Sequence, residues 1–413
     1  MAIRPTLWCV TSLTSRAAAL AAALCTALAG SLAAGTLAAP ARAADAARHA
    51  EHSFDTGPEL GAGRVSQTVV RRGQVRVPDS ARTVRRGGRS YLRGAWTSPW
   101  VETGFTLTEL IPSWEAGARG DSLVRVQVRG LAADGTASSW DTAALWSEAN
   151  PRVLRRSLGS QSDDLARMNV DTWQAAGGLA QWQVRVTLLR KAGSRLRVRL
   201  DRVGAVASAL VPRGDAPTSA PGPAAGTVLD VPSYSQMTHL GHWPQWGGGG
   251  EAWCSPTSLA MVLAYYGAQP GLPPGVPAGH GDPWVDHTAR MVFDHTYDGT
   301  GNWPFNTAYA ATRVAGDAYV TRLRSLREAE DHIAAGVPLI ASISFARGAL
   351  TGSPISASNG HLLVIVGFEA DGDVVVNDPA GDSNGEVRRV YDRDQFEDLW
   401  INASGGLVYV VGR

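Results

Sequence analysis

The sequence predicts an α+β domain in the C-terminal half of the chain, preceded by an all-β, sandwich-like domain. Two observations carry this prediction. The first half is rich in short segments that alternate apolar and polar residues, the period of a half-buried strand, as in residues 122–130. The second half begins with an amphipathic helical pattern and continues with apolar strand-like runs, an order typical of α+β domains.

The first 43 residues have the features of a signal peptide. Two early arginines supply a positive start, residues 17–37 are rich in Ala and Leu, and residues 41–43 (Ala-Arg-Ala) resemble a cleavage site. We therefore expect a secreted protein whose mature chain begins at Ala44. A retained membrane anchor is the alternative, because the apolar stretch is long for a signal. No later segment approaches the ~20 apolar residues that a spanning helix needs.

The mature chain is expected to contain two domains joined by a linker. Residues 44–211 form the predicted sandwich-like accessory domain, and residues 227–413 form the α+β domain. Between them, residues 212–226 are dense in Pro, Gly and Ala and show no apolar periodicity, which indicates a semi-stiff linker.

Three segments of the accessory domain alternate as strands do, namely residues 122–130, 183–187 and 196–200. Seven tryptophans also fall in this domain: Trp96, Trp100, Trp114, Trp140, Trp146, Trp173 and Trp182. They fit either the packing of a sandwich core or a face that binds a sugar or another polymer. The acidic pair Asp163-Asp164 has no partner motif and is expected to form a turn or a calcium-tolerant loop.

The net charge of +1 hides a strong asymmetry between the two halves. Residues 44–211 hold 24 basic and 16 acidic residues, whereas residues 212–413 hold 11 basic and 21 acidic residues. Either the two halves attract each other, or the basic half binds an acidic surface outside the cell, such as a cell-wall polymer. No basic helix or aromatic–basic motif indicates nucleic acid, so we do not expect it as a partner.

The α+β domain is predicted to begin with a helix over residues 256–266. Its apolar residues follow the i, i+3, i+4, i+7 spacing of one helical face, with Ser255 as the expected N-cap and Gly267 as the expected stop. A second helix is predicted over residues 325–335. The later strand-like runs cover residues 338–345, 361–368, 373–376 and 407–411.

Cys254 is the only cysteine after the signal peptide, and it lies at the start of the first predicted helix. A lone thiol forms no internal disulfide and is a poor basis for a metal site. The positive end of a helix favours the thiolate, which is the reactive form of cysteine. Cys254 is therefore a candidate nucleophile, and a buried structural cysteine is the alternative.

A predicted hairpin brings a histidine and a carboxylate to the same region. His361 opens one strand-like run, Asp371-Gly372 marks a tight turn, and the returning run ends at Asp378. Regular register would leave His361 and Asp378 some residues out of step, so we expect neighbourhood rather than contact. The other histidines considered lack such a setting: His239, His242, His280, His287, His295 and His332.

Neither a metal nor a cofactor is expected from the sequence. His287 and His295, together with Asp282, Asp286 and Asp294, could imitate a metal site, but their spacing fits no tight ligand pattern. No nucleophile, metal cluster or phosphate-binding loop is recognised in residues 44–211.

Four motifs resemble the C39-like branch of the papain-like cysteine peptidases, across roughly residues 228–413. They are VPSYSQ, ending at Gln236; WCSPTSLAMVLAYYG, around Cys254; NGHLLVIVGF, around His361; and VVVNDPAG, around Asp378. The whole chain resembles secreted actinobacterial proteins of this kind. The resemblance implies a papain-like fold, in which a helix that carries the cysteine packs on an antiparallel sheet.

The resemblance also implies the roles of individual residues. Cys254 would attack, His361 would act as base and then as acid, and Asp378 would orient the imidazole, with Asn377 as the alternative orienter. Gln236 and the Cys254 backbone N–H would donate to the oxyanion. The chain departs from the family pattern in the long segment between Gln236 and Cys254, and in Ser255, where the family often has glycine.

The expected function is hydrolysis of a peptide or isopeptide bond in a peptide or protein substrate, through an acyl-enzyme. The chain has no ATPase motif, so the trimming of leader peptides inside exporters is not implied. One alternative is acyl transfer by the same residues, as in a transpeptidase. Another is a non-catalytic cell-surface binding protein, in which the thiol is idle.

Overall fold

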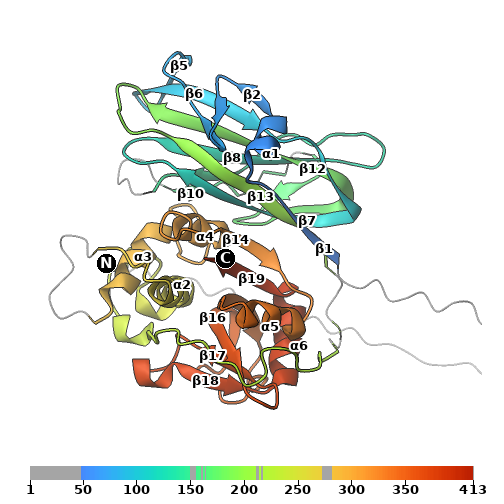
Figure 1. Cartoon of the computed structure of the whole chain (residues 1–413), viewed down its shortest axis with the longest axis vertical. Coiled ribbons are helices and arrows are strands. Elements are labelled where there is room, and N and C mark those ends of the chain that lie inside the picture. The colour runs from blue at the N-terminus through green and yellow to red at the C-terminus, as the bar shows by residue number, and fades with distance from the viewer. Residues whose placement is uncertain are drawn as a thin grey trace, which may run out of the picture. The chain divides into compact units, whose positions relative to one another are not determined.

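The computed structural model describes residues 48–412, apart from gaps at 149–154, 160, 163, 211–213, 215–216 and 272–280. The described residues belong to one compact unit, Asp45–Arg413. The predicted signal peptide and Asp163 lie outside the described residues. In the described part, strands predominate over helices (Figure 1). None of the described helices has both the length and the apolar character that crossing a membrane requires.

The N-terminal domain is built from strands β1–β13 and one short helix (Figure 1). Hydrogen bonds join all thirteen strands into one sheet network, whose main path runs β10-β9-β8-β12-β7-β13-β4-β3. The bounds are β1 (Arg48–Phe54), α1 (Gly57–Ala62), β2 (Arg64–Ser66), β3 (Val69–Arg71), β4 (Gln74–Arg76), β5 (Thr83–Arg86), β6 (Arg89–Thr97), β7 (Val101–Gly117), β8 (Leu123–Leu131), β9 (Asp141–Trp146), β10 (Arg156–Ser157), β11 (Arg167–Met168), β12 (Trp173–Lys191) and β13 (Arg199–Ala209).

The period-two pattern predicted this domain well in its centre and less well at its edges. In β8, Val124, Val126 and Val128 are buried, as the alternation requires. The predicted strand 183–187 lies inside β12, but residues 196–198 precede β13 and are not strand. The long strand β12 pairs with β6, β7 and β8 and shifts register along its length, so it joins what the sequence suggested would be two separate sheets.

The tryptophans of this domain divide between core and surface. Five are buried to below 2 % exposure and pack the interior: Trp96, Trp114, Trp146, Trp173 and Trp182. Trp100 and Trp140 instead lie half-buried against guanidinium groups of the sheet surface. Core packing therefore accounts for most of these residues, and two of them remain for a surface role.

The C-terminal domain combines helices with a six-stranded antiparallel sheet of order β14-β19-β15-β16-β17-β18 (Figure 1). The strands are β14 (Ala318–Arg322), β15 (Leu339–Phe345), β16 (Ser358–Phe368), β17 (Val374–Asn377), β18 (Arg388–Tyr391) and β19 (Leu407–Val411). The helices are α2 (Cys254–Tyr265), α3 (Pro283–Val292), α4 (Trp303–Ala310), α5 (Leu326–Ala334) and α6 (Arg393–Ser404), with short 3₁₀ turns η1 (Met237–His239), η2 (Gly250–Ala252) and η3 (Asn384–Glu386).

Both faces of this sheet are covered, which explains why its strands read as continuous apolar runs. Along β16, Leu362, Val364 and Val366 pack in one core cluster with apolar residues of α2 and α4. The alternate residues Leu363 and Ile365 pack in a second cluster with apolar residues of α5 and α6. Side chains of successive strand residues point to opposite faces, so one strand serves both cores.

The two domains share contacts within the unit Asp45–Arg413. Phe305 of α4 packs against Trp114 and Trp146, with ring centroids 6.0 and 5.8 Å apart. The backbone N–H of Ala318 in β14 donates to the Glu115 carboxylate at 2.9 Å. The apolar part of this contact belongs to the same core cluster as α2, so the N-terminal domain continues the core that supports α2.

Candidate active site

Cys254 is the first residue of α2, whose N-cap is Trp253. The predicted cap, Ser255, is wrong: its hydroxyl instead forms a 3.0 Å hydrogen bond with the Tyr409 hydroxyl of β19. A cysteine in the first helical turn lies among backbone N–H groups that have no partner within the helix. Their partial positive charge favours the thiolate.

His361 lies on β16, which packs against α2. Close to it, the Ser258 hydroxyl of α2 donates to the Leu362 carbonyl at 3.1 Å and fixes the helix to the strand. The His361 side chain is buried and lies within hydrogen-bonding reach of the Cys254 thiol. Helix α2 and strand β16 therefore bring the predicted nucleophile and the predicted base together.

Asp378 contacts His361 directly, with its Oδ1 atom 2.7 Å from the Nε2 atom of the imidazole. In the register of β16 and β17, Asn377 opposes Val364, so Asp378 follows at the level of Leu363. His361 lies two residues further along β16, and such diagonal neighbours are within reach of long side chains. The pair is therefore closer than the sequence predicted.

Further hydrogen bonds hold the Asp378 carboxylate in place. Its Oδ2 atom accepts from the Tyr391 hydroxyl at 2.7 Å, and Oδ1 also accepts from the Ala380 backbone N–H at 3.0 Å. Its own backbone N–H donates to the Val387 carbonyl at 2.8 Å. Both carboxylate oxygens are thus occupied, which fixes the imidazole through its Nε2 atom and leaves Nδ1 for the thiol.

The electrostatics of these three buried groups favour a charged arrangement. Burial raises the pKa of the Cys254 thiol, but the hydrogen bond and charge of His361 outweigh it, so this pKa is lowered. Burial lowers the pKa of His361, but the Asp378 carboxylate and the thiolate raise it by more than burial lowers it, so this pKa lies above its ordinary value. Burial is likewise outweighed for Asp378, and its pKa is lowered by His361. The favoured state is a thiolate, an imidazolium and a carboxylate.

Asn377, the alternative orienter, points elsewhere. Its Nδ2 atom donates to the Val231 and Pro232 carbonyls at 3.1 Å, and its Oδ1 atom accepts from Arg388 at 2.6 Å. Of the two candidates, the structure places Asp378 beside His361.

Gln236 lies between the Asp378 loop and the segment that leads to Cys254. Its backbone N–H donates to the Pro379 carbonyl at 2.8 Å, and its Nε2 atom donates to the Glu251 carbonyl at 2.7 Å. The side chain is buried, and its Oε1 atom has no partner among the described residues. One N–H of the amide is therefore used to hold the segment before Cys254, and the other is available.

A cavity of about 520 Å³ opens at Cys254. Its lining comes from both domains and comprises Asn169, Val170, Asp171, Gly247, Ala252, Cys254, Tyr297, Asp298, Gly299, Thr300, Gly301, Trp303, Ser342, Gly360 and Leu362. A second cavity, of about 260 Å³, shares Trp303, Ser342 and Gly360 with it. The stretch Gly299–Arg313 both lines the cavity and, through the buried α4, completes the fold.

Sequence reasoning missed the part that the N-terminal domain plays in this cavity. The Asp171 carboxylate accepts from Thr172 and from the Trp303 backbone N–H, at 3.2 and 3.4 Å. Burial raises the pKa of Asp171 to about 6. No motif surrounds Asp171 in the sequence, and only the packing of the domains brings it near Cys254.

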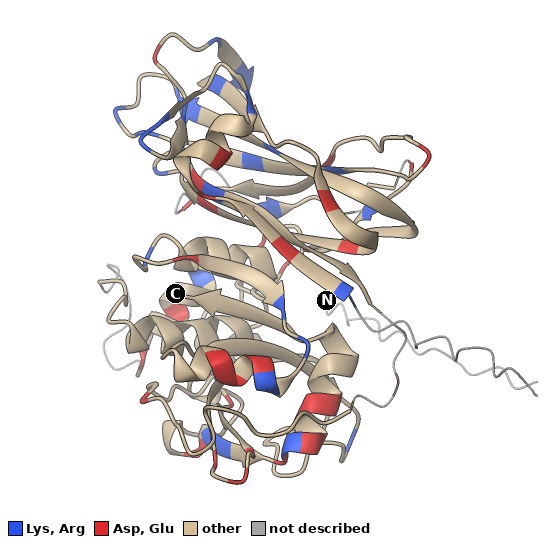
Figure 2. Cartoon of the chain, turned by 45° about the vertical axis from the view of Figure 1, so that its right-hand side comes forward, with Lys and Arg blue, Asp and Glu red and all other residues tan. Residues whose placement is uncertain are grey.

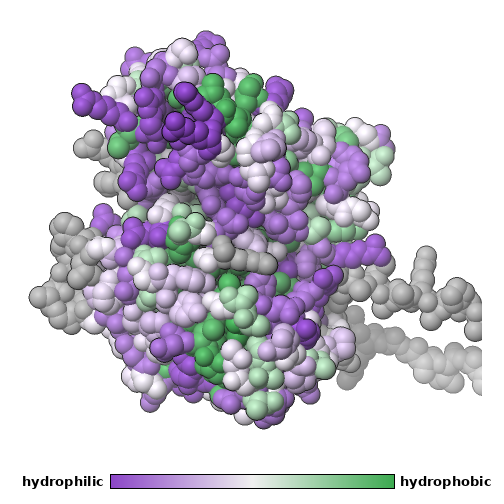
Figure 3. All heavy atoms as spheres, viewed as in Figure 1, coloured by the Kyte–Doolittle hydropathy of each residue, from purple (hydrophilic) through white to green (hydrophobic). Residues whose placement is uncertain are grey.

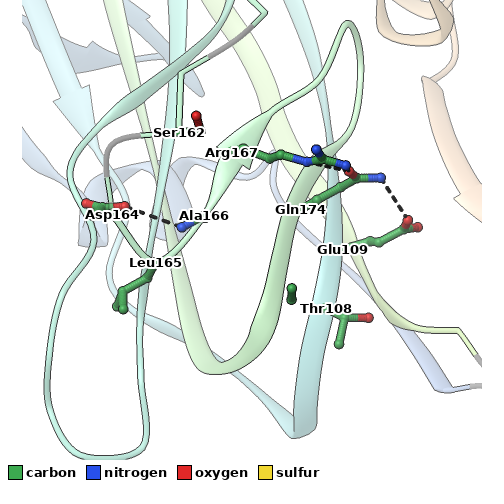
Figure 4. A pocket seen from close by; sticks show the side chains of 9 residues that line it. Thr108, Glu109, Ser162, Asp164, Leu165, Ala166, Arg167 and Gln174 are labelled. Atoms are coloured by element: carbon green, nitrogen blue, oxygen red, sulfur yellow. Dashed lines mark hydrogen bonds between the residues drawn. The ribbon is translucent and has the colours of Figure 1, made fainter.

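A hollow of about 570 Å³ on the N-terminal domain has a different character (Figure 4). Arg167 donates to Gln174, which in turn donates to Glu109 at 3.4 Å. Asp164 accepts from the Ala166 backbone N–H at 3.4 Å, as an acidic residue in a turn does. Arg167, Gln174 and Glu109 are thus paired with one another, as the dashed lines in Figure 4 show, and among the described residues no cysteine or histidine lines this hollow.

Comparisons with known proteins match both halves of the chain. Residues 50–208 match the model of the peptidase C39 N-terminal domain, and residues 228–408 match that of the peptidase C39-like family. Among solved structures, a crystal structure of a Bacillus anthracis protein described as C39-like aligns with 19% identity and a TM-score of 0.29, covering 45% of this chain and 98% of that one. The comparison with curated proteins gives no match. The two family models together account for nearly all the described residues, so the chain combines a peptidase C39 N-terminal domain with a domain of the peptidase C39-like family.

Proposed function

We propose that the protein is a secreted cysteine peptidase, which hydrolyses a peptide or isopeptide bond through an acyl-enzyme. The observation that carries the proposal is the buried 2.7 Å contact between His361 and Asp378, with the Cys254 thiol within reach of the same imidazole. The peptidase family supports this class of reaction. A papain-like fold of the C-terminal domain is part of the proposal, supported by the packing of α2 on β16.

In the first step, the Cys254 thiolate attacks the substrate carbonyl carbon, and the carbonyl π electrons move onto oxygen. The Cys254 backbone N–H and the available N–H of Gln236 stabilise this oxyanion. As the oxyanion collapses, the C–N bond breaks and the His361 imidazolium gives its proton to the departing amine. The product is a thioester between Cys254 and the acyl group.

In the second step, water attacks the thioester and neutral His361 takes a proton from it. The C–S bond breaks, the acid product leaves, and the thiolate–imidazolium pair returns. Throughout, Asp378 holds the imidazole through Nε2 and stabilises its positive charge, while Tyr391 fixes the carboxylate.

The cavity supports a substrate that meets both domains. Asp171 and its neighbours from the N-terminal domain form one part of its lining, and Trp303 and Gly360 from the C-terminal domain form another. An extended peptide would lie along the two cavities, which share Trp303 and Gly360. Burial of Asp171 makes it a hydrogen-bonding group rather than a fixed charge at mildly acidic pH.

Activity-based labelling tests the proposal. The full mature chain is incubated with a panel of peptidyl electrophiles and with fluorogenic peptides, and the wild type is compared with Cys254→Ala. Hydrolysis that persists in Cys254→Ala would overturn the cysteine-peptidase proposal. Adding a primary amine distinguishes hydrolysis from acyl transfer, because a transferase forms the amide of the added amine. A thiol that alkylates no faster than free cysteine at acidic pH would favour the non-catalytic binding protein.

We further propose that the N-terminal domain attaches the protein to an acidic polymer of the cell surface. Five arginines lie close enough on neighbouring strands to influence one another: Arg64, Arg93, Arg125, Arg129 and Arg185. Burial, followed by the charges of these neighbours, lowers the pKa of Arg185 to about 10. Figure 2 shows basic residues on the strands of this domain, and Figure 3 shows hydrophilic residues over much of its surface.

Aromatic rings support this arginine surface. The Arg129 guanidinium lies 4.8 Å from the Trp100 ring and 4.7 Å from the Trp140 ring, and that of Arg185 lies 4.2 Å from Trp140. The Nε and Nη2 atoms of Arg129 and Arg185 donate to the Gln183 and Gln127 side chains. The rings hold these guanidinium groups flat, and their Nη1 side is the one proposed to meet a phosphate or carboxylate. The proposal thus assigns a surface role to the two tryptophans that do not pack the core.

A further inference from the structure

Two histidines and an aspartate converge in the segment between Gln236 and Cys254. His239 ends η1, His242 follows it, and Asp286 comes from α3. The Nδ1 atoms of His239 and His242 lie 3.2 Å apart. The two oxygens of Asp286 lie 2.9 Å from the first of these nitrogens and 3.0 Å from the second.

The spacing of these atoms fits a shared cation better than hydrogen bonds alone. If both imidazoles donate to Asp286, their two Nδ1–H groups face each other at 3.2 Å with no acceptor between them. A cation bonded to nitrogen and oxygen at ~2.0–2.1 Å with tetrahedral angles holds its ligand atoms about 3.3–3.4 Å apart. The N–N separation and the two N–O separations, which involve different oxygens of Asp286, lie somewhat below that spacing, and one ligand atom from each of the three residues lies within 4.8 Å of the others.

Burial strengthens the argument. His239 is fully buried, Asp286 is 2% exposed, and the His242 side chain is 18% exposed. The Nε2 atom of His239 is buried and has no hydrogen-bond partner among the described residues. The His239 ring therefore makes its hydrogen-bond contacts through Nδ1 alone, toward His242 and Asp286. Burying the unpaired Nε2 atom costs free energy of folding, and a strong bond at Nδ1 offsets this cost.

We propose that His239, His242 and Asp286 bind a divalent transition-metal ion, with Zn²⁺ the best fit. Two imidazoles and one carboxylate suit Zn²⁺, whereas Mg²⁺ and Ca²⁺ prefer all-oxygen sites. Three protein ligands leave one position for water, and His242 is the ligand through which solvent reaches the group. The sequence hides this site because Asp286 lies more than forty residues after the histidines.

The ion would tie the segment before Cys254, whose ordering costs conformational entropy, to α3. Between His242 and Cys254 the backbone adopts left-handed φ angles at Trp243 and at Gly247, Gly248 and Gly249, from 45° to 111°. Ordering such a glycine-rich segment loses conformational entropy, which a cross-link offsets. Since Gln236 and Cys254 lie on either side of the segment, the metal is a structural element that positions them. This last consequence alone rests on the proposed function.

Metal content and thermal unfolding test the site without using activity. A thiolate–imidazole pair can itself bind zinc, so the measurements use the full mature chain carrying Cys254→Ala and no affinity tag. After equilibration with Zn²⁺ and dialysis, we expect about one zinc per chain by mass spectrometry. We also expect a melting temperature several degrees above that of the EDTA-treated protein, and visible absorption of a four-coordinate site with Co²⁺.

Matched variants localise the ion. His239→Ala with His242→Ala should abolish stoichiometric zinc and the zinc-dependent thermal shift, whereas His295→Ala, which removes a histidine from another loop, should keep both. If the double variant does not fold, Asp286→Asn keeps the shape and a hydrogen-bond acceptor, and should weaken zinc binding 10-fold or more. Substoichiometric zinc in the parent protein, or unchanged zinc in these variants, would overturn the proposal and leave a hydrogen-bonded Asp–His–His network.

Discussion

The Nε2 atom of His361 lies 2.7 Å from the Oδ1 atom of Asp378, although the register of β16 and β17 sets His361 two positions away from the level of Asp378, the residue that follows β17. This diagonal contact gives the imidazole a fixed orientation and a buried counter-charge. It also makes different predictions for each member of the group, because Cys254 forms the covalent bond, His361 moves the proton, and Asp378 only orients.

Removing either Cys254 or His361 should reduce hydrolysis by several powers of ten, and the two losses should not add, because the residues act as one unit. Asp378→Ala should cost less, since orientation is partly replaceable. The measurement is kcat/KM on one fluorogenic peptide for the three variants and the double variant Cys254→Ala with His361→Ala.

Asn377→Ala is the matched control for the orienting residue. It removes the neighbouring polar side chain, which bonds to Val231 and Arg388 rather than to His361. We expect a loss of stability with kcat nearly unchanged. A larger fall in kcat for Asn377→Ala than for Asp378→Ala would show that the orienter has been misassigned.

The lowered pKa of Cys254 and the raised pKa of His361 predict a wide pH range for thiol alkylation. The thiolate should persist as pH falls below the ordinary thiol value and disappear only below the lowered pKa of Cys254. In His361→Ala the thiol loses its partner, so the onset should move up toward pH ~8.5. At pH ~5.5 the iodoacetamide rate should then fall about 100-fold.

The same pKa shifts predict how this pair affects folding stability. A histidine whose folded pKa is raised contributes stability that is complete below its unfolded pKa and is lost as pH rises through the folded value. The free energies of unfolding of wild type and His361→Ala, measured across alkaline pH, should therefore become more similar as pH rises. If the difference between them grew with rising pH, His361 would not be paired as described.

Gln236→Ala tests the oxyanion donor. If its free amide N–H stabilises the oxyanion, the variant should lose about 10²–10³ in kcat with little change in KM. Gln269→Ala is the control, because that glutamine bonds to Tyr234 and has no proposed role. An effect on KM alone would place Gln236 in substrate binding instead.

The arginine surface predicts salt-sensitive attachment. Changing Arg125, Arg129 and Arg185 to Gln should abolish cosedimentation with an anionic cell-wall polymer, while the same change at the exposed Arg71, Arg72 and Arg82 removes equal charge elsewhere and should have a smaller effect. Binding by the wild type should weaken as salt screens charges over ~8–10 Å. Salt-insensitive binding would assign the contact to the tryptophans rather than the arginines.

Local sequence signals predicted the elements that carry the site better than the contacts between them. The helix expected over residues 256–266 is α2, displaced by one or two residues, because its apolar spacing is strong. The His361–Asp378 contact depends on the register of β16 and β17, which has an irregularity between Ile365 and Gly367. The sequence contains no residue pattern that predicts this register or its irregularity. Cavity residues such as Asp171 come from another domain, so local patterns hold no signal for them.

The contacts between the domains bear on whether residues 227–413 fold alone. The charge asymmetry and the linker favour independent modules, in which this half is soluble and hydrolyses a small peptidyl ester. The structure favours dependence, because Phe305 and Tyr309 of α4 are buried in a core cluster that includes Trp114 and Trp146. Without the N-terminal domain, these apolar side chains would be exposed to water.

We therefore expect residues 227–413, expressed alone, to aggregate or to unfold at a lower temperature than the full mature chain. Adding residues 44–211 in trans should restore solubility and the labelling of Cys254, since each domain supplies part of one core and of the cavity beside the thiol. The control is the full chain cut within the linker, which keeps both parts at equal concentration. An isolated C-terminal half with the melting temperature and labelling rate of the full chain would show that the N-terminal domain is a separate attachment module.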